Sequence, residues 1–141
     1  MDAKSAFLNG DLKKEIYMKI PPEQDRPEEH VWWLRKTLYD LKQVLWEWYT
    51  KMHKIMVGLE YKVSVADKCV FTHIDANSYL IIVAVYVNDF LFISKSLKFV
   101  ESSKSEMSSH FEMKNLGPVK WILQMELNYN ISNDVTTLSQ S

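Results

Sequence analysis

Two segments that lie far apart in the chain carry side chains able to hold a metal ion. The tetrapeptide YVND at positions 86–89 interrupts a run of apolar, β-branched residues, and Asp2 lies in a short apolar segment near the start. Phosphoryl transfer with two Mg²⁺ ions needs hard oxygen ligands, because the cations neutralise charge on the attacking and leaving oxygens. A tight turn between strands holds such ligands rigidly. The sequence therefore predicts a divided site made of Asp2, Asn88 and Asp89.

The elements that would position this site follow from the spacing of the apolar residues. Alternating or continuous apolar residues predict strands over 15–20, 31–34, 68–74, 79–86, 90–94 and 121–129. Apolar residues at three- and four-residue steps predict helices over 44–59 and 97–111. A turn at Asn88 and Asp89 would join two strands into a hairpin, whose apolar flanks predict burial on both faces. We expect the α+β fold class, with helices packed on one face of an antiparallel sheet.

The composition limits the class of protein. A hydrophobic fraction of 47% over 141 residues is typical of one globular domain, spanning residues 1–141. The net charge of -1 offers no overall attraction for nucleic-acid phosphates, so any such binding must be local. Cys69 has no second cysteine to pair with, and the sequence has neither a secretory leader nor an apolar run of membrane-spanning length. We expect an intracellular protein, in the cytoplasm or nucleus, without a membrane anchor.

Five blocks of residues, taken in order, resemble the reverse transcriptases of copia-type retrotransposons, which are part of a Pol polyprotein. The blocks are 1–10 (MDAKSAFLNG), 38–49 (LYDLKQVLWEWY), 66–71 (ADKCVF), 86–89 (YVND) and 111–117 (FEMKNLG). The resemblance implies RNA-directed DNA polymerase activity, a nucleotidyltransferase reaction, on a partial right-hand polymerase palm. It further implies an RNA or DNA template-primer and deoxynucleotides as partners, with Mg²⁺ or Mn²⁺ as the cofactor.

The same resemblance assigns substrate contacts to three residues. Phe7 falls where such enzymes place a ring against the sugar of the incoming nucleotide, which excludes a 2′-hydroxyl group. Gln43 resembles the glutamine on the nucleotide or template side, and Tyr86 begins the metal-site tetrapeptide. Asp2 and Asp89 would be the metal ligands.

The sequence departs from the family at the residues nearest to the chemistry. The family tetrapeptide is Tyr-Val-Asp-Asp, whereas Asn88 replaces its first aspartate and removes one anionic ligand. The family block Leu-Tyr-Gly-Leu-Lys-Gln-Ala-Pro-Arg has Asp40 at its glycine and residues 44–46 (VLW) at its last three positions. Asp2 lies one residue from the start, and we expect the fingers, thumb and RNase H to be missing. We therefore expect a truncated, degenerate palm that does not synthesise DNA by itself.

Less specific interpretations remain for each of these features. Asp2 and Asp89 could be ordinary surface carboxylates, and Phe7 could be a core aromatic. The chain could be a non-catalytic remnant that binds nucleic acid or an intact polymerase, or a residual transposon reading frame without function. Tryptophans at apolar periodic positions are usually core residues, although they could also stack on bases. Those in question are Trp32, Trp33, Trp46, Trp48 and Trp121.

Overall fold

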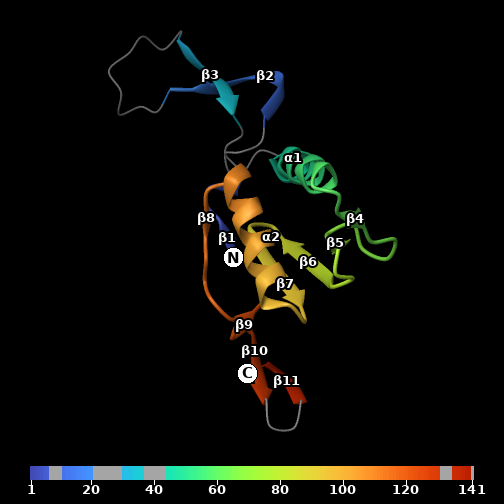
Figure 1. Cartoon of the computed structure of the whole chain (residues 1–141). Helices are drawn as coiled ribbons and strands as arrows, with labels where there is room; N and C mark the ends of the chain where they lie inside the picture. The colour runs from blue at the N-terminus through green and yellow to red at the C-terminus, as the bar shows by residue number, and fades with distance from the viewer. Residues whose placement is uncertain (7–10, 21–29, 37–43, 131–134, 141) are drawn as a thin grey trace.

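The computed structural model describes residues 1–6, 11–20, 30–36, 44–130 and 135–140, and Figure 1 shows their arrangement. Phe7, Asp40 and Gln43 lie outside these residues. The two helices are α1 (Val44–Gly58) and α2 (Leu97–His110). Both agree with the predicted helices to within one residue at each end. The α+β class is confirmed, because these helices accompany sheets whose strand pairs are all antiparallel.

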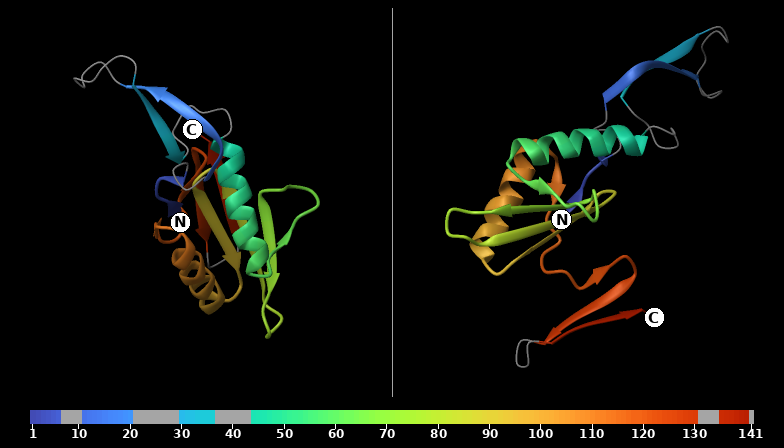
Figure 2. Two further views of the ribbon diagram at one scale, coloured as in Figure 1. Left: turned by 90° about the horizontal axis from the view of Figure 1, so that it is seen from above. Right: turned by 90° about the vertical axis from the view of Figure 1, so that its right-hand side faces the viewer.

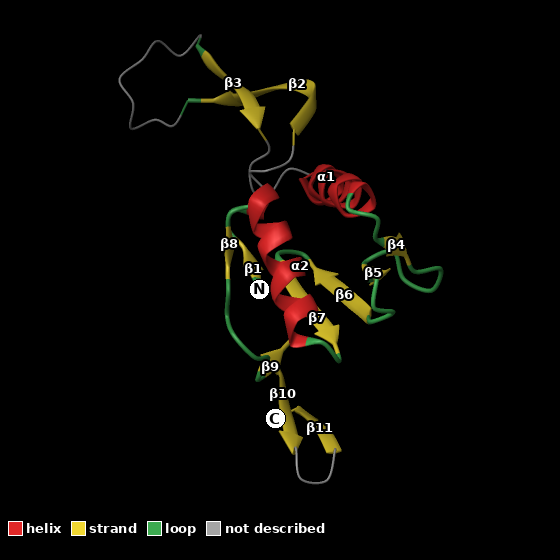
Figure 3. Ribbon diagram, in the orientation of Figure 1, coloured by secondary structure: helices red, strands yellow, loops and turns green. Residues whose placement is uncertain are grey.

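The central sheet has six strands in the order β4-β5-β6-β7-β1-β8. Their bounds are β1 (Asp2–Ala3), β4 (Lys62–Val63), β5 (Val70–Ile74), β6 (Leu80–Tyr86), β7 (Asp89–Ser94) and β8 (Met113–Lys114). The strands β4 to β7 are neighbours in both sequence and space, as a meander requires. By contrast β1 comes from the start of the chain, and it lies between β7 and β8 (Figure 3). This crossover brings the first residues of the chain beside the β6–β7 hairpin.

Both helices pack on the same face of the central sheet. In α1 the residues that point into the core recur every fourth position, which places Trp48, Met52 and Met56 in one row. They meet the row Ile81, Val83 and Val85 of β6, all in one buried cluster that also contains Met107 of α2. Removing these apolar side chains from water supplies the main driving force for the fold. The helix α2 begins at a cap in which the Ser96 hydroxyl accepts a hydrogen bond from the Phe99 amide (3.3 Å).

The opposite face of the central sheet is only partly covered, which corrects the prediction of burial on both faces. Exposure alternates along β6, so that Ile81 and Val83 are fully buried while Leu80 and Tyr86 are exposed. In β7, Ile93 is 49% exposed on the same outer side as its register partner Ile82. A continuous apolar run does not reveal by itself which faces are covered. Among the described residues, the helices cover one face alone.

Two small sheets flank the central one, at opposite ends in Figure 1 and in the right-hand view of Figure 2. One is the hairpin of β2 (Asp11–Lys19) and β3 (Val31–Lys36), and the other joins β9 (Trp121–Ile122), β10 (Met125–Asn130) and β11 (Val135–Gln140). Every residue of β11 is exposed. The strands predicted over 15–20 and 31–34 are confirmed as β2 and β3, although β2 begins four residues earlier and β3 ends two residues later. The strand predicted over 121–129 is divided by a turn at Leu123 and Gln124 into β9 and β10.

Candidate active site

The crossover of β1 brings together the three residues predicted for the metal site. Asp2 of β1 is the register partner of Asp89 in β7. The strand β6 lies on the other side of β7 in the same sheet. The Ala3 amide donates to the Asn88 carbonyl oxygen (2.8 Å), and the Phe90 amide donates to the Met1 carbonyl oxygen (2.7 Å). Backbone pairing thus places Asp2 beside Asn88 and Asp89, although more than eighty positions of the chain separate it from them.

The hairpin turn lies one residue earlier than the sequence predicted. Val87 and Asn88 form the turn, whereas Asp89 is already the first residue of β7 and pairs with Tyr86. Val87 has a φ of +57°, in the left-handed region that β-branched residues rarely adopt. Such a conformation costs about 1–2 kcal/mol for a residue with a Cβ. Surrounding contacts must therefore hold this turn.

Trp48 of α1 supplies one of these contacts. Its indole Nε1 donates to the Val87 carbonyl oxygen at 2.6 Å, across 39 positions of the chain. The indole is only 2% exposed and is fixed by edge-to-face packing on Phe111 (5.0 Å between ring centroids) and Phe90 (6.5 Å). Sequence reasoning took Trp48 for a core residue and missed this polar role. The signal was present, because a buried indole N–H needs an acceptor.

Asn88 directs its amide nitrogen at the neighbouring carboxylate. Its Nδ2 donates a hydrogen bond to Oδ1 of Asp2, which ties the turn to β1. An N–H donor repels a cation, so this arrangement does not present the Asn88 oxygen and the Asp2 oxygen to one shared ion. Among the described residues, no cluster of three or more histidine, cysteine, aspartate or glutamate side chains could hold a metal. The side chains around Asp2 therefore do not fit a pair of Mg²⁺ ions.

Two other charged groups near β1 are an exposed salt bridge and a partly buried amino group. The Lys4 Nζ and Glu112 Oε1 atoms form a salt bridge of 2.6 Å, and both side chains are mostly exposed. Glu112 raises the pKa of Lys4 through this hydrogen bond and its charge. The pKa of the Met1 amino group is lowered, mainly by burial and then by Lys104, while Asp89 and Asp2 raise it.

The remaining predicted residues are distributed over different surfaces. Tyr86 is 58% exposed and lies opposite Asp89, so it is available to a bound molecule beside the site. Phe7 and Gln43 lie outside the described residues, and their predicted contacts stay predictions. Of the five tryptophans, Trp48 is buried and Trp32 is half-buried. The three that are exposed are Trp33, Trp46 and Trp121.

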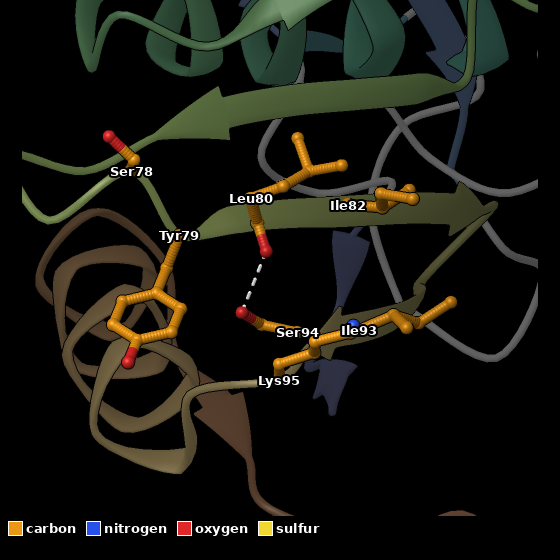
Figure 4. A pocket seen from close by; sticks show the side chains of 7 residues that line it. All are labelled: Ser78, Tyr79, Leu80, Ile82, Ile93, Ser94 and Lys95. Atoms are coloured by element: carbon orange, nitrogen blue, oxygen red, sulfur yellow. Dashed lines mark hydrogen bonds between the residues drawn. The ribbon is translucent and has the colours of Figure 1, made fainter.

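A pocket of about 420 Å³ opens at the end of the β6–β7 hairpin that is remote from the turn. Figure 4 shows its lining, where Ser94 Oγ donates to the Leu80 carbonyl oxygen at 2.7 Å. Seven residues between positions 78 and 95 form the wall, and none of them carries a carboxylate. This pocket is therefore separate from the group of Asp2, Asn88 and Asp89. In the described part of the chain, neither helix has the length and apolar character needed to cross a membrane.

Comparison with known proteins identifies the family. The family model of reverse transcriptase (RNA-dependent DNA polymerase) matches residues 1–141. A retrovirus-related Pol polyprotein from transposon TNT 1-94 of Nicotiana tabacum is 37% identical over 129 residues, which are 90% of this chain and 10% of that protein. The Pol polyprotein from transposon RE1 of Arabidopsis thaliana is 30% identical over 89% of this chain and 9% of its own length.

A shorter relative covers the chain more fully. A putative transposon Ty5-1 protein of Saccharomyces cerevisiae is 28% identical over 138 residues, or 96% of this chain and 44% of the relative. No solved structure matches. This chain spans about a tenth of the Pol polyproteins that it matches. The resemblance to copia-type retrotransposon proteins is confirmed, and the chain belongs to the reverse transcriptase (RNA-dependent DNA polymerase) family.

Proposed function

We propose that this chain is the palm region of a copia-type reverse transcriptase and that it does not polymerise DNA by itself. The observation that carries the proposal is the hydrogen bond from the Asn88 amide nitrogen to the Asp2 carboxylate. In this proposal residues 1–141 form one partial palm domain. The fingers, thumb and RNase H parts expected from the resemblance lie outside these residues, and the protein acts inside the cell.

The charge at the site explains the expected loss of activity. Transfer of a nucleotide to a primer end develops negative charge on phosphoryl oxygens, and anionic ligands hold the cations that neutralise it. With Asn88 in place, Asp2 and Asp89 are the two carboxylates that meet at the turn. The amide adds no negative charge, and its donor end is already bound to Asp2. We therefore expect Mg²⁺ or Mn²⁺ to bind weakly.

The geometry of the neighbouring residues fits a palm that keeps its general form. Tyr86 and Asp89 lie at the exposed end of the hairpin, where a primer end and a deoxynucleotide could approach. We propose Phe7 and Gln43 as further substrate contacts on the strength of the family resemblance. Positioning of both reactants supplies much of the acceleration in phosphoryl transfer, so a metal site alone would be insufficient.

The experiment is a primer-extension assay with a DNA primer on an RNA template, in Mg²⁺ and separately in Mn²⁺. We expect no extension by the unmodified chain, and none after Asn88→Asp, while an intact reverse transcriptase serves as the positive control. Template-dependent extension by the unmodified chain would refute the proposal. Extension only after Asn88→Asp would show that the amide is the sole block and that this chain positions its substrates unaided.

A second function, nucleic-acid binding without catalysis, is favoured by a specific surface of the protein. The β2–β3 hairpin exposes aromatic rings next to positive charges. A chain that has lost its metal site could retain such a surface. Salt-dependent binding of an oligonucleotide, without extension of a primer, would distinguish this second function from catalysis.

A further inference from the structure

The side of the central sheet that the helices leave uncovered carries apolar side chains, and we call this side of β5, β6 and β7 the outer face. Leu80 of β6 is 46% exposed there, and its register partner Ile74 of β5 is 62% exposed. Ile93 of β7 is 49% exposed. Among the described residues of these three strands, Asp89 is the one charged residue on the outer face. An open antiparallel sheet usually alternates apolar and polar residues, so grouped apolar residues on its open side indicate a binding surface.

The two ends of the outer face differ in shape and in charge. At the turn of the β6–β7 hairpin, the Tyr86 side chain is 58% exposed, and its register partner Asp89 supplies a carboxylate. At the other end lies the pocket of about 420 Å³, whose lining includes the apolar residues Leu80 and Ile93 and the exposed cation Lys95 (Figure 4). One end therefore offers an aromatic ring beside an anion, and the other offers an apolar cavity beside a cation.

These features are spaced equally about one point in the hairpin. On β6 the residue midway between Leu80 and Tyr86 is Val83. On the neighbouring strand and the residue that follows it, the midpoint of the segment 89–95 is Phe92. Val83 and Phe92 are register partners, so the two midpoints lie side by side in the sheet. A two-fold axis that runs across the strands at this pair, parallel to the sheet, would exchange the two ends of the outer face.

We infer that the outer face binds a second copy of this chain about this axis, with Tyr86 of each copy in the pocket of the other and Asp89 paired with Lys95 of the other copy. Each contact then occurs twice, as a symmetric dimer requires. Aromatic rings that fill pockets supply much of the binding energy of protein interfaces, and complementary charges fix the orientation. A partner with an apolar surface alone would leave Asp89 and Lys95 unpaired, whereas a second copy pairs both.

The size of the outer face sets the strength of this association. Three strands about 4.8 Å apart, each with six residues at a rise of about 3.4 Å, cover roughly 15 by 20 Å in projection. Stable dimers commonly bury about 800 Å² on each partner, so this face is small. Two apolar sheet faces can stack at a separation of about 10 Å. We therefore expect a reversible dimer with a dissociation constant in the micromolar range.

This inference goes beyond the proposed function, because it concerns a protein partner rather than polymerisation. In the dimer Tyr86 and Asp89 are covered, so neither is open to a primer end in that form. Association is measured without nucleic acid and in EDTA, whereas polymerisation is measured by primer extension. Failure of one proposal therefore leaves the other to be judged by its own assay.

The test is sedimentation equilibrium of the full chain over about 1–200 µM, in EDTA. The average mass should rise with concentration from 16.6 kDa towards twice that value. Tyr86→Thr keeps a residue suited to a strand and removes the ring, and it should raise the dissociation constant at least about 30-fold, as expected for an aromatic anchor. The matched control is Tyr17→Thr, because Tyr17 is 57% exposed in another sheet. That variant should associate like the unmodified chain.

An exchange of charges tests the orientation of the two copies. Lys95→Asp should weaken the dimer at least about 10-fold, because it brings two carboxylates together. Adding Asp89→Lys should return the dissociation constant to within about 3-fold of the original, because the pair is re-formed with its signs exchanged. Positions 89 and 95 lie about 20 Å apart along one chain, so this rescue requires contact between copies.

The far-UV circular dichroism of each variant establishes that it is folded before its mass is interpreted. A chain that stays monomeric at every concentration would overturn the inference, and so would an equal effect of Tyr86→Thr and Tyr17→Thr. Association that the folded double variant Lys95→Asp with Asp89→Lys does not recover would exclude the two-fold arrangement.

Discussion

The contact between Trp48 and Val87 gives the most specific prediction about how the turn of the candidate site is held. The change is Trp48→Phe, which keeps an aromatic ring against Phe90 and Phe111 and removes the indole donor. The Val87 carbonyl oxygen then loses its partner at 2.6 Å in a partly buried place. An unsatisfied acceptor in such a place costs about 1–3 kcal/mol. The smaller ring also removes apolar contacts from a site that is 2% exposed, which adds about 1 kcal/mol.

We therefore expect Trp48→Phe to lower the free energy of unfolding by about 2–4 kcal/mol, measured by urea denaturation. Tyr49→Phe is the matched control. Tyr49 is the residue after Trp48 in α1, and its hydroxyl group donates to the Lys68 carbonyl oxygen at 3.1 Å. The change to phenylalanine therefore also removes a donor to a backbone carbonyl group. That bond is exposed and competes with water, so its loss should cost at most about 0.5 kcal/mol.

A double-mutant cycle with Val87→Gly isolates the role of the strained turn. A glycine adopts positive φ freely and can turn its carbonyl group towards water once the indole donor is gone. Trp48→Phe should therefore be less damaging in the Val87→Gly background, with a coupling energy of at least about 0.5 kcal/mol. The reasoning fails if Trp48→Phe costs no more than Tyr49→Phe. It fails equally if the cost of Trp48→Phe is the same with either residue at position 87.

Three further predictions concern Asn88 in the turn, Tyr61 and Lys4. In EDTA, the Asn88→Asp variant should be about 1.5–3 kcal/mol less stable than the unmodified chain, because a carboxylate replaces the amide that donates to Asp2. In a thermal melt, added Mg²⁺ should restore the stability of the variant and leave that of the unmodified chain unchanged. Burial raises the pKa of Tyr61 above 10.0, an effect that the neighbouring Ser103 partly opposes. The contribution of neutral Tyr61 to the free energy of unfolding is therefore complete below pH 10 and is lost as pH rises through the raised pKa. In denaturant titrations at rising pH, the Tyr61→Phe variant should lose less stability than the unmodified chain. Lys4→Met should change stability by less than about 1 kcal/mol, with or without added salt, because its bridge to Glu112 is exposed; a larger loss would show an additional role for Lys4.

The helices and the central hairpin could be predicted from the sequence because each has a strong periodic signal. The four-residue steps of Trp48, Met52 and Met56 indicate one face of α1 without knowledge of the fold. The juxtaposition of Asp2 with the hairpin has no such local signal. It depends on β1 crossing to lie between β7 and β8, and the prediction came from the family resemblance.

The local conformation of the turn could not be predicted, for a physical reason. Polar residues favour turns, so Asn88 and Asp89 were the natural choice for the tip. The structure instead places Val87 in the turn at positive φ, against the preference of a β-branched side chain. A donor on α1, remote in the sequence, provides a compensating bond. Tertiary contacts thus override local preference at this position.

The tip of the hairpin is held by two nitrogen donors that belong to the protein. The Trp48 indole binds the Val87 carbonyl oxygen, and the Asn88 amide binds the Asp2 carboxylate. If Asp2 faced a carboxylate at position 88, the two negative charges would repel each other unless a cation lay between them. Asn88 removes this repulsion and closes the gap with a hydrogen bond. With Asn88 in this position, β1 therefore pairs with the hairpin without a cation between the two side chains.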